Sequence, residues 1–149
     1  MHYIFEFEIY PDDGMYIAIP FELEGGTQGS TFEEACYMAT DWLQTELEYR
    51  SMQNEPIPTT KLNHEPRFGG TVVMVSVKAG LDTIQKVSAS DAARMLGVSP
   101  GRVTQMVHAG LLIAFKEGYH SWVTLDSVQA RLAEQPHAGR PKRNCLVGE

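Results

Sequence analysis

Five acidic side chains in the N-terminal half have the residue type that metal-dependent phosphodiester hydrolysis requires. Glu6 and Glu8 alternate along an expected strand, whereas Glu33, Glu34 and Asp41 lie in an expected helix. Two-metal chemistry needs several carboxylates that converge on the same ions. Period-two alternation turns Glu6 and Glu8 away from the apolar side on which the helix must pack. We therefore expect a solvated acidic surface that suits a basic protein partner, with no catalytic residue and no metal.

A second group of polar residues, in the stretch SASDAARMLGVSPGRVTQMVHAGLL (residues 88–112), has the types that read bases in DNA. At helical spacing Val103 and Met106 face inward, and the polar residues occupy the opposite face. Arginine can bind guanine and glutamine can bind adenine, each through two hydrogen bonds worth ~1–3 kcal/mol of discrimination. The candidate DNA contacts are Ser99, Gly101, Arg102, Thr104, Gln105 and His108.

Capping residues divide this stretch into two short helices with a tight turn between them. Ser88 has the position of an N-cap for the first helix, and Gly97 is a typical stop residue. Ser99 is a preferred N-cap for the second helix, Pro100 takes its first position, and Gly110 ends it. Two short helices with a polar outer stripe on the second are typical of a helix-turn-helix.

The residues that follow predict a β-hairpin and a last helix. Residues 113–115 and 121–123 read as short strands joined by a turn that contains Gly118, and we expect Trp122 to anchor the hairpin to the core. A hairpin directly after a recognition helix is a wing. Its candidate DNA contacts are Lys116, Tyr119 and His120. The last helix is capped by Thr124 and carries Leu125, Val128 and Leu132 on one face.

Two segments, AARMLGVS (residues 92–99) and WV (residues 122–123), are similar to those of a known family. Residues 83–134 resemble the winged helix-turn-helix of excisionase and MerR-type DNA-binding proteins. This resemblance implies that the second helix enters the major groove of duplex operator DNA, where its N-terminal residues meet base edges.

The N-terminal half predicts a small sheet covered by one helix. Residues 3–10 alternate as a half-buried strand, a turn follows at 11–14, and residues 15–19 give a second strand. The stretch 30–50 has capping-box spacing and a helical apolar stripe. The stretch 69–79 is β-branched and should form a further strand that is fully or nearly fully buried. The expected inward residues of the helix are Ala35, Met38, Ala39, Trp42, Leu43 and Leu47.

Several phrases of this half resemble the HicB-type antitoxins of bacterial toxin-antitoxin systems. They are DDGMYIAIP (12–20), GGTQGSTFEEA (25–35) and PIP (56–58), in the family's order. The chain departs from the family pattern in the three residues before Thr-Gln-Gly, which are Glu24, Gly25 and Gly26. The resemblance implies a partial ribonuclease-H-like fold and a HicA-type toxin, a small basic ribonuclease, as partner. The candidate toxin-binding residues are Glu6, Glu8, Asp12, Asp13, Glu22 and Glu24.

Acidic and basic residues are unevenly distributed between the two halves of the 149-residue chain. Residues 1–80 hold 13 acidic and 4 basic residues, whereas residues 81–149 hold 6 acidic and 8 basic residues. We expect an α+β protein with a toxin-binding domain at 1–80, a winged helix-turn-helix domain at 83–134 and a basic, disordered tail at 135–149. The sequence has no apolar run of ~20 residues and no signal peptide, so we expect a cytoplasmic protein without membrane contact.

The tail contains the segment GRPKR, whose Arg140, Lys142 and Arg143 are further candidate DNA contacts. The segment resembles the core of an AT-hook, which lies in a narrow A·T-rich minor groove. It lacks the arginine that usually precedes the glycine, because Ala138 stands there. A basic tail that binds phosphates without sequence preference is the alternative reading.

Together the two halves predict an antitoxin that neutralises a HicA-type toxin and represses its own operon. We expect no cofactor, and a homodimer or higher even oligomer in which an exposed edge strand of the N-terminal sheet pairs. Two alternatives remain open. One is a metal-dependent nuclease with a DNA-targeting head, and the other is an excisionase-like or ligand-sensing transcription regulator without a toxin partner.

Overall fold

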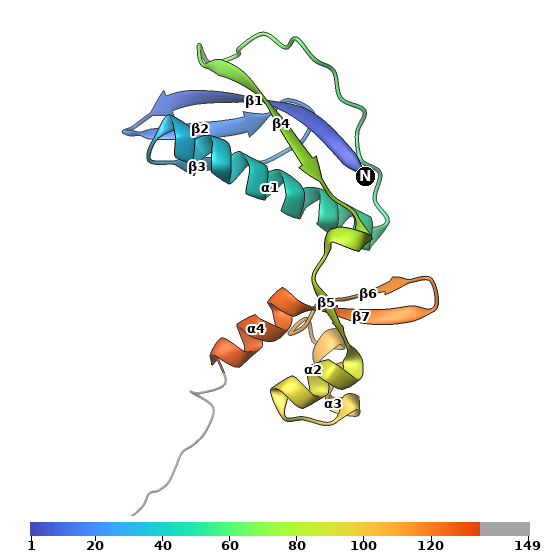
Figure 1. The fold of residues 1–149 in the computed structure, drawn as a ribbon. Coiled ribbons are helices and arrows are strands. Elements are labelled where there is room, and N and C mark those ends of the chain that lie inside the picture. Colours follow the sequence, from blue (N-terminus) through green and yellow to red (C-terminus); the bar gives the residue numbers. More distant parts are fainter. Residues whose placement is uncertain (135–149) are drawn as a thin grey trace, which may run out of the picture. The chain divides into compact units, whose positions relative to one another are not determined.

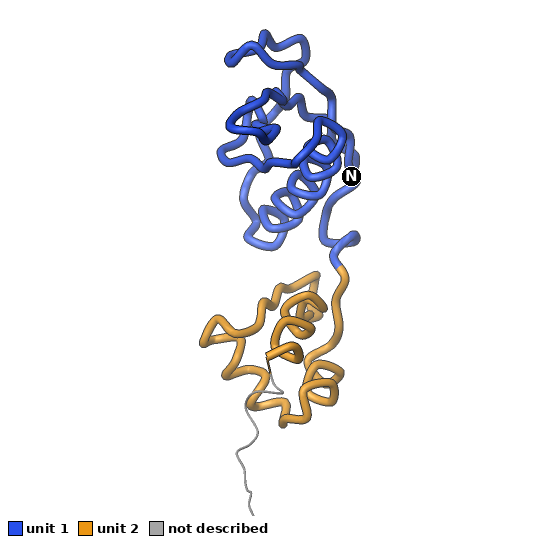
Figure 2. The backbone as a smooth tube through the Cα atoms, turned by 90° about the vertical axis from the view of Figure 1, so that its left-hand side faces the viewer, with its two compact units in different colours: residues 1–84 blue, residues 85–149 orange. Residues whose placement is uncertain are grey.

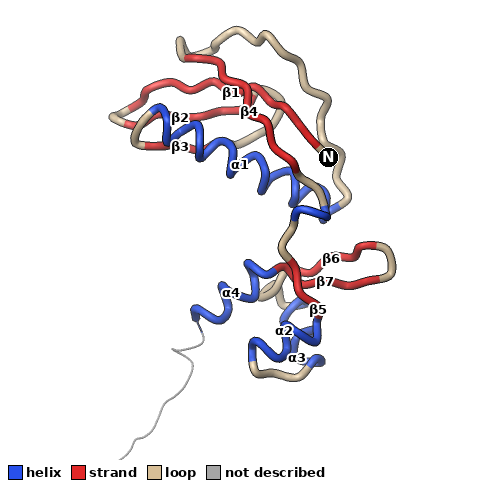
Figure 3. Tube along the Cα trace, viewed as in Figure 1, coloured by secondary structure: helices blue, strands red, loops and turns tan. Residues whose placement is uncertain are grey.

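The computed structural model describes residues 1–134, which form two compact units. The first unit is Met1–Ile84 and the second begins at Gln85 (Figure 2). Helices and antiparallel sheets occur in both units, so the protein is a mixed α+β structure (Figure 3). Within the described residues none of the helices has the length and apolar character needed to cross a membrane.

A four-stranded antiparallel sheet forms the first unit. Its strands are β1 (His2–Asp12), β2 (Met15–Pro20), β3 (Thr27–Gly29) and β4 (Thr71–Lys78), in the spatial order β3-β2-β1-β4 (Figure 1). The expected hairpin of β1 and β2 is confirmed. Its turn places Asp13 and Gly14 at φ values of 50° and 78°, the left-handed pair that suits a two-residue hairpin loop.

Helix α1 (Phe32–Gln53) packs across one face of this sheet (Figure 1). The helix begins where Thr31 Oγ1 accepts the Glu34 N–H at 3.0 Å, and it ends at Asn54, whose φ is 58°. Its buried stripe is Ala35, Ala39, Leu43 and Leu47. The expectation that Met38 faces inward is wrong, because the stripe repeats every four residues and Met38 falls outside it on the exposed side.

Strand β4 lies at an edge of the sheet, and the prediction of a nearly fully buried strand is wrong. Its buried residues, Val75 and Val77, alternate with the exposed Met74, Ser76 and Lys78. The β-branched run predicted a strand correctly. Composition alone could not distinguish a central strand from an edge strand that is covered on one face.

The second unit packs three helices around a three-stranded sheet. The strands are β5 (Lys86–Ser88), β6 (Ala114–Glu117) and β7 (His120–Thr124), in the order β5-β7-β6. The helices are α2 (Ala89–Leu96), α3 (Pro100–His108) and α4 (Leu125–Glu134). A 3₁₀ turn, η1 (Leu81–Thr83), ends the first unit. Sequence reasoning missed β5, which is only three residues long.

Both helices of the expected pair begin and end as their capping residues predict. Ser88 Oγ accepts the Asp91 N–H at 3.0 Å, and Ser99 Oγ accepts the Arg102 N–H at 3.1 Å. Gly97 ends α2 at a φ of 69°. This left-handed value explains why a glycine stands there, since a side chain would be strained.

The core of the second unit differs from expectation at Trp122. The buried stripe of α2 is Ala92, Ala93 and Leu96. Trp122 does not belong to the core cluster, and the neighbouring Val123 anchors the hairpin to it instead. Successive residues of β7 face opposite sides of the sheet, and Trp122 lies on the side where the Lys86 ammonium is 5.1 Å from its ring centroid.

Candidate nucleic-acid and protein interfaces

Helix α3 presents a polar face to solvent. Val103 and Met106 hold the helix to the core of its unit. Val107 is half-buried against the same core, and the other positions of the helix are exposed. Arg102 and Gln105 lie one turn apart, with Arg102 Nη1 3.5 Å from Gln105 Oε1. The structure thus exposes every sequence-predicted residue of this helix and its cap: Ser99, Gly101, Arg102, Thr104, Gln105 and His108. Ser99 Oγ caps the helix and Thr104 Oγ1 donates to the Pro100 carbonyl at 3.3 Å. The exposed side chains of Arg102, Gln105 and His108 therefore offer the donors and acceptors that can meet base edges.

Two cations of the second unit have no carboxylate partner within the described residues. Three other basic side chains of residues 85–134 are neutralised by ion pairs: Lys86 with Glu117 at 2.7 Å, Arg94 with Asp91, and Arg131 with Glu134 at 2.8 Å. Arg102 on α3 and Lys116 on β6 are the cations left. An anion that approaches this unit therefore meets its uncompensated positive charge on the helix and the hairpin.

The β6–β7 hairpin carries exposed groups at its tip. Gly118 adopts a φ of 64°, which permits the tight turn, and the next residue, Tyr119, is fully exposed. Lys116 and His120 are also exposed, and the His120 ring lies 5.9 Å from that of Trp122. The structure therefore brings all three predicted wing residues to one end of the hairpin. The predicted contacts Arg140, Lys142 and Arg143 lie outside the described residues.

Glu6 and Glu8 are buried, which corrects the expectation that they belong to a solvated acidic surface. Their side chains point away from α1, as strand alternation predicts, but only 4% of Glu6 and none of Glu8 is exposed. The long connection between α1 and β4 passes over this second face of the sheet (Figure 1). Its backbone N–H groups bind both carboxylates and keep them from solvent. A partner protein therefore cannot reach them unless this connection moves.

Glu8 accepts three backbone hydrogen bonds from the connection. The N–H groups of Arg67, Phe68 and Gly70 lie 2.7, 2.8 and 2.9 Å from its carboxylate oxygens. Burial raises the pKa of Glu8, but these N–H groups and the charge of Arg67 outweigh burial and leave the pKa below its ordinary value. The carboxylate of Glu8 therefore acts as an internal anchor for the connection.

Glu6 anchors the same connection through Asn63 and His64. Both backbone N–H groups donate to its carboxylate at 2.9 Å, and His64 Nδ1 lies 2.6 Å from Oε1. Burial raises the pKa of Glu6, and the bonds from His64 and Asn63 lower it to a net value below the ordinary one. His64 Nε2 lies 2.8 Å from Glu22 Oε2, so both ring nitrogens have carboxylate partners.

These bonds bear on the nuclease hypothesis, which needs Glu6 and Glu8 as metal ligands. Their oxygens already accept hydrogen bonds from main-chain N–H groups, which a metal would have to displace. Residues 1–134 contain no group of three or more His, Cys, Asp and Glu side chains placed to hold a metal ion. Sequence alternation placed the two glutamates on the correct face, but no sequence signal identified the segment that covers them.

The exposed part of the predicted toxin-binding set is smaller than expected. Asp12 and Asp13 lie at the β1–β2 turn and are exposed, as is Glu24 after β2. Glu22 is largely covered, because its carboxylate accepts the Lys61 N–H at 3.1 Å and contacts His64. Of the predicted set, Asp12, Asp13 and Glu24 are thus available to a partner, while Glu6, Glu8 and Glu22 serve the unit internally.

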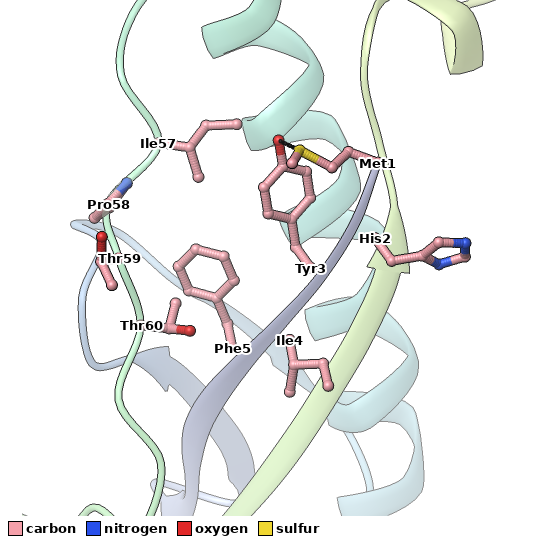
Figure 4. Close-up of a pocket in the computed structure, with 9 residues that line it drawn as sticks. All are labelled: Met1, His2, Tyr3, Ile4, Phe5, Ile57, Pro58, Thr59 and Thr60. Carbon is pink, nitrogen blue, oxygen red and sulfur yellow. Dashed lines mark hydrogen bonds between the residues drawn. The ribbon is translucent and has the colours of Figure 1, made fainter.

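A cavity of about 330 Å³ lies beside the N-terminal half of β1. The side chains of Tyr3 and Phe5 line one wall, and the extended segment 57–60 forms the other (Figure 4). Strand β2 pairs with β1 only from Phe7 onward, which explains the gap in the sheet at this place. The lining contains no carboxylate.

Similarity to known proteins is found among solved structures. No family model matches the sequence. No curated protein matches it either. A solved structure of a toxin-antitoxin complex from Streptococcus pneumoniae contains a similar chain, with 20% sequence identity and a TM-score of 0.45. The similarity covers 74% of the present chain and 99% of the other chain.

Proposed function

We propose that the protein is the antitoxin of a type II toxin-antitoxin system and the repressor of its own operon. In this proposal the second unit is a winged helix-turn-helix that binds operator DNA. The first unit is a partial ribonuclease-H-like domain that binds a HicA-type toxin. The support comes from the sequence phrases that resemble these families and from the geometry of the two units.

The observation that carries the proposal is the placement of free cations in the second unit. Arg102 and Lys116 lack intramolecular carboxylate partners within residues 85–134, although other cations of that unit are paired. Helix α3 begins at a capped N-terminus and is exposed on its polar side, which would allow that side to enter the major groove. Arg102 would bind a guanine edge, and Lys116 in the wing would bind phosphate.

Toxin binding is supported by charge and by the order of elements. The first unit has the strand pair, helix and returning strand that the sequence predicts for the HicB-type domain, with the short strand β3 before the helix. Its exposed acids Asp12, Asp13 and Glu24 complement a basic ribonuclease. By covering the ribonuclease, the antitoxin would exclude RNA from the toxin's surface. The same negative charge would keep DNA away from the first unit.

Co-expression with the short reading frame beside the gene tests this proposal. We expect that reading frame alone to stop growth, the present chain to restore it, and the two proteins to copurify. Removing charge without changing shape, by Asp12→Asn, Asp13→Asn and Glu24→Gln together, should weaken copurification. Asparagine tolerates the positive φ of position 13, so the turn should persist.

Arg102→Ala is the matched control, because it should abolish repression and leave the growth rescue intact. A neighbouring product that is harmless, or that does not bind the chain, would contradict toxin neutralisation. Promoter activity that is unchanged by Arg102→Ala would contradict repression through α3.

A further inference from the structure

Strand β4 presents an unpaired edge over its full length. It pairs with β1 on one side and is the last strand of the sheet on the other. The opposite edge is β3, which has three residues and is held close to α1: a Cβ at Gly29 would lie 2.5 Å from the Ala35 nitrogen. The two edges are therefore unequal, and only β4 is long enough to serve as a template for another strand.

The register shows which backbone groups of β4 face outward. Met1 and Ala79 exchange hydrogen bonds in both directions, at 3.0 and 3.4 Å, so they form a hydrogen-bonded pair of the β1–β4 ladder. Alternation then directs the N–H and C=O groups of Val73, Val75 and Val77 to β1. The N–H and C=O groups of Val72, Met74 and Ser76 point away from the sheet. Among the described residues these groups have no hydrogen-bond partner.

The usual means of protecting an edge strand are missing here. Residues 71–77 contain no charged residue and no proline, and the ladder with β1 runs without a bulge. Two apolar side chains beside the edge are also unprotected, since Met74 is 65% exposed and Ile4 is 45% exposed. A strand that lay against β4 would place its own side chains beside Met74.

We propose that β4 pairs in antiparallel fashion with β4 of a second copy, with Met74 on the two-fold axis. In this register Val72 of each copy faces Ser76 of the other. The three outward-facing residues then form three hydrogen-bonded pairs, which corresponds to about six hydrogen bonds. A two-fold interface must be self-complementary, and this edge is, because each copy offers the same donors and acceptors in reverse order.

Charge favours a second copy at this edge over other surfaces of the unit. The unit is acidic overall, so two copies repel each other across most orientations. Strand β4 brings no carboxylate to the contact, and its one cation, Lys78, would lie at the start of the partner strand. Gly70 is located there, with its N–H bound to the Glu8 carboxylate at 2.9 Å. The contact therefore brings no two like charges of β4 together, and the nearby Glu8 carboxylate stays buried in its own unit.

Light scattering on the full-length chain tests the proposal with matched variants at one position. Ser76→Pro removes the outward N–H without breaking the ladder with β1, because proline is tolerated where an edge N–H faces solvent. Ser76→Ala keeps that N–H. At about 50 μM chain we expect a dimer for the parent and for Ser76→Ala, and a monomer with unchanged circular dichroism for Ser76→Pro.

Cysteine cross-linking tests the register and does not depend on whether Ser76→Pro folds. In a chain with Cys36→Ala and Cys145→Ser, Met74→Cys should form a disulfide-linked dimer on mild oxidation, since facing Cα atoms of a hydrogen-bonded pair lie about 5.5 Å apart. Ser76→Cys should not, because its two copies would lie about 14 Å apart.

A monomeric parent chain, or a Ser76→Pro variant that remains as dimeric as Ser76→Ala, would overturn the proposal. So would equal cross-linking of Met74→Cys and Ser76→Cys. None of these outcomes depends on toxin or DNA, so failure of the dimer and failure of the proposed function can be told apart.

Discussion

The two units use charged side chains in opposite ways. In the first unit Glu6 and Glu8 are turned inward and accept main-chain hydrogen bonds from the segment that covers them. In the second unit Arg102 and Lys116 are turned outward and have no carboxylate partner among the described residues. The first arrangement stabilises a fold, and the second leaves charge available for binding.

This contrast shows that the net charge of a half does not identify its interface. Residues 1–80 carry 13 acids, yet Glu6 and Glu8 at the centre of the sheet are structural, and the exposed acids lie in its turns, on α1 and in the connection that follows α1. Residues 85–134 hold five basic and four acidic residues, so that unit is nearly neutral. Its capacity for DNA depends on which cations are left unpaired, and only a structure shows this.

The largest expected effect comes from removing an inward charge. Glu8→Ala leaves the N–H groups of Arg67, Phe68 and Gly70 without their acceptor, and hydrogen bonds to a charged group are worth more than neutral ones. We expect urea unfolding of the first unit to show a loss of about 3 kcal/mol. Glu24→Ala, at an exposed position, should change stability by less than about 0.5 kcal/mol. Similar losses for both variants would show that Glu8 is not an anchor.

Removing an outward charge should affect binding and leave folding unchanged. Arg102→Ala should weaken binding to the operator by about 1–3 kcal/mol and relax the base preference at one position. Arg94→Ala is the control, because Arg94 is also exposed but pairs with Asp91 on α2. Fluorescence anisotropy with a labelled operator duplex measures both variants. Equal affinities for the two variants would contradict the assignment of the α3 face.

Acid should destabilise the first unit through the same inward charges. The pKa values of Glu6 and Glu8 lie below the ordinary value of 4.5, so the folded state favours their ionised forms. Their contribution is fully present above pH 4.5 and is lost as the pH falls through the lowered pKa values. Urea midpoints of the first unit should therefore fall in this range.

The variant Glu8→Gln tests the origin of this acid sensitivity, because glutamine cannot titrate. Its urea midpoint should be lower than that of the parent at neutral pH and should change less between neutral pH and pH 3. Glu24→Gln is the control and should follow the parent. If the urea midpoints of the parent, Glu8→Gln and Glu24→Gln all fell by the same amount between neutral pH and pH 3, the acid sensitivity would come from other groups.

The smallest expected effect is at the wing. Lys116→Ala removes one phosphate contact, so it should weaken binding to specific and random duplexes alike, by a few-fold. The slope of log affinity against log salt concentration should fall by about 1. An unchanged salt slope would mean that the hairpin does not contact the backbone of DNA.

Local signals in the sequence were sufficient for the helices and hairpins. Ser88, Ser99 and Thr31 each cap a helix as their residue types predict, and Asp13 and Gly14 form the turn that their types favour. These features depend on neighbouring residues, so the sequence contains the information directly.

Long-range features could not be predicted in the same way. The burial of Glu6 and Glu8 depends on bonds to residues 63–70, which lie more than 50 positions away along the chain. The edge position of β4 depends on the pairing of the whole sheet, and the outward position of Trp122 depends on the register of β5 with β7. Patterns of type and spacing identify faces, but they do not show what covers a face.

Salt-dependent binding of the full-length chain to the duplex upstream of its own coding sequence tests the central claim most directly. We expect the parent to bind this duplex at least about tenfold more tightly than a random duplex between about 50 and 200 mM salt. The double variant Arg102→Ala, Lys116→Ala should lose that preference while its unfolding midpoint stays unchanged. A parent chain that binds both duplexes equally, or a double variant that keeps the preference, would contradict the account.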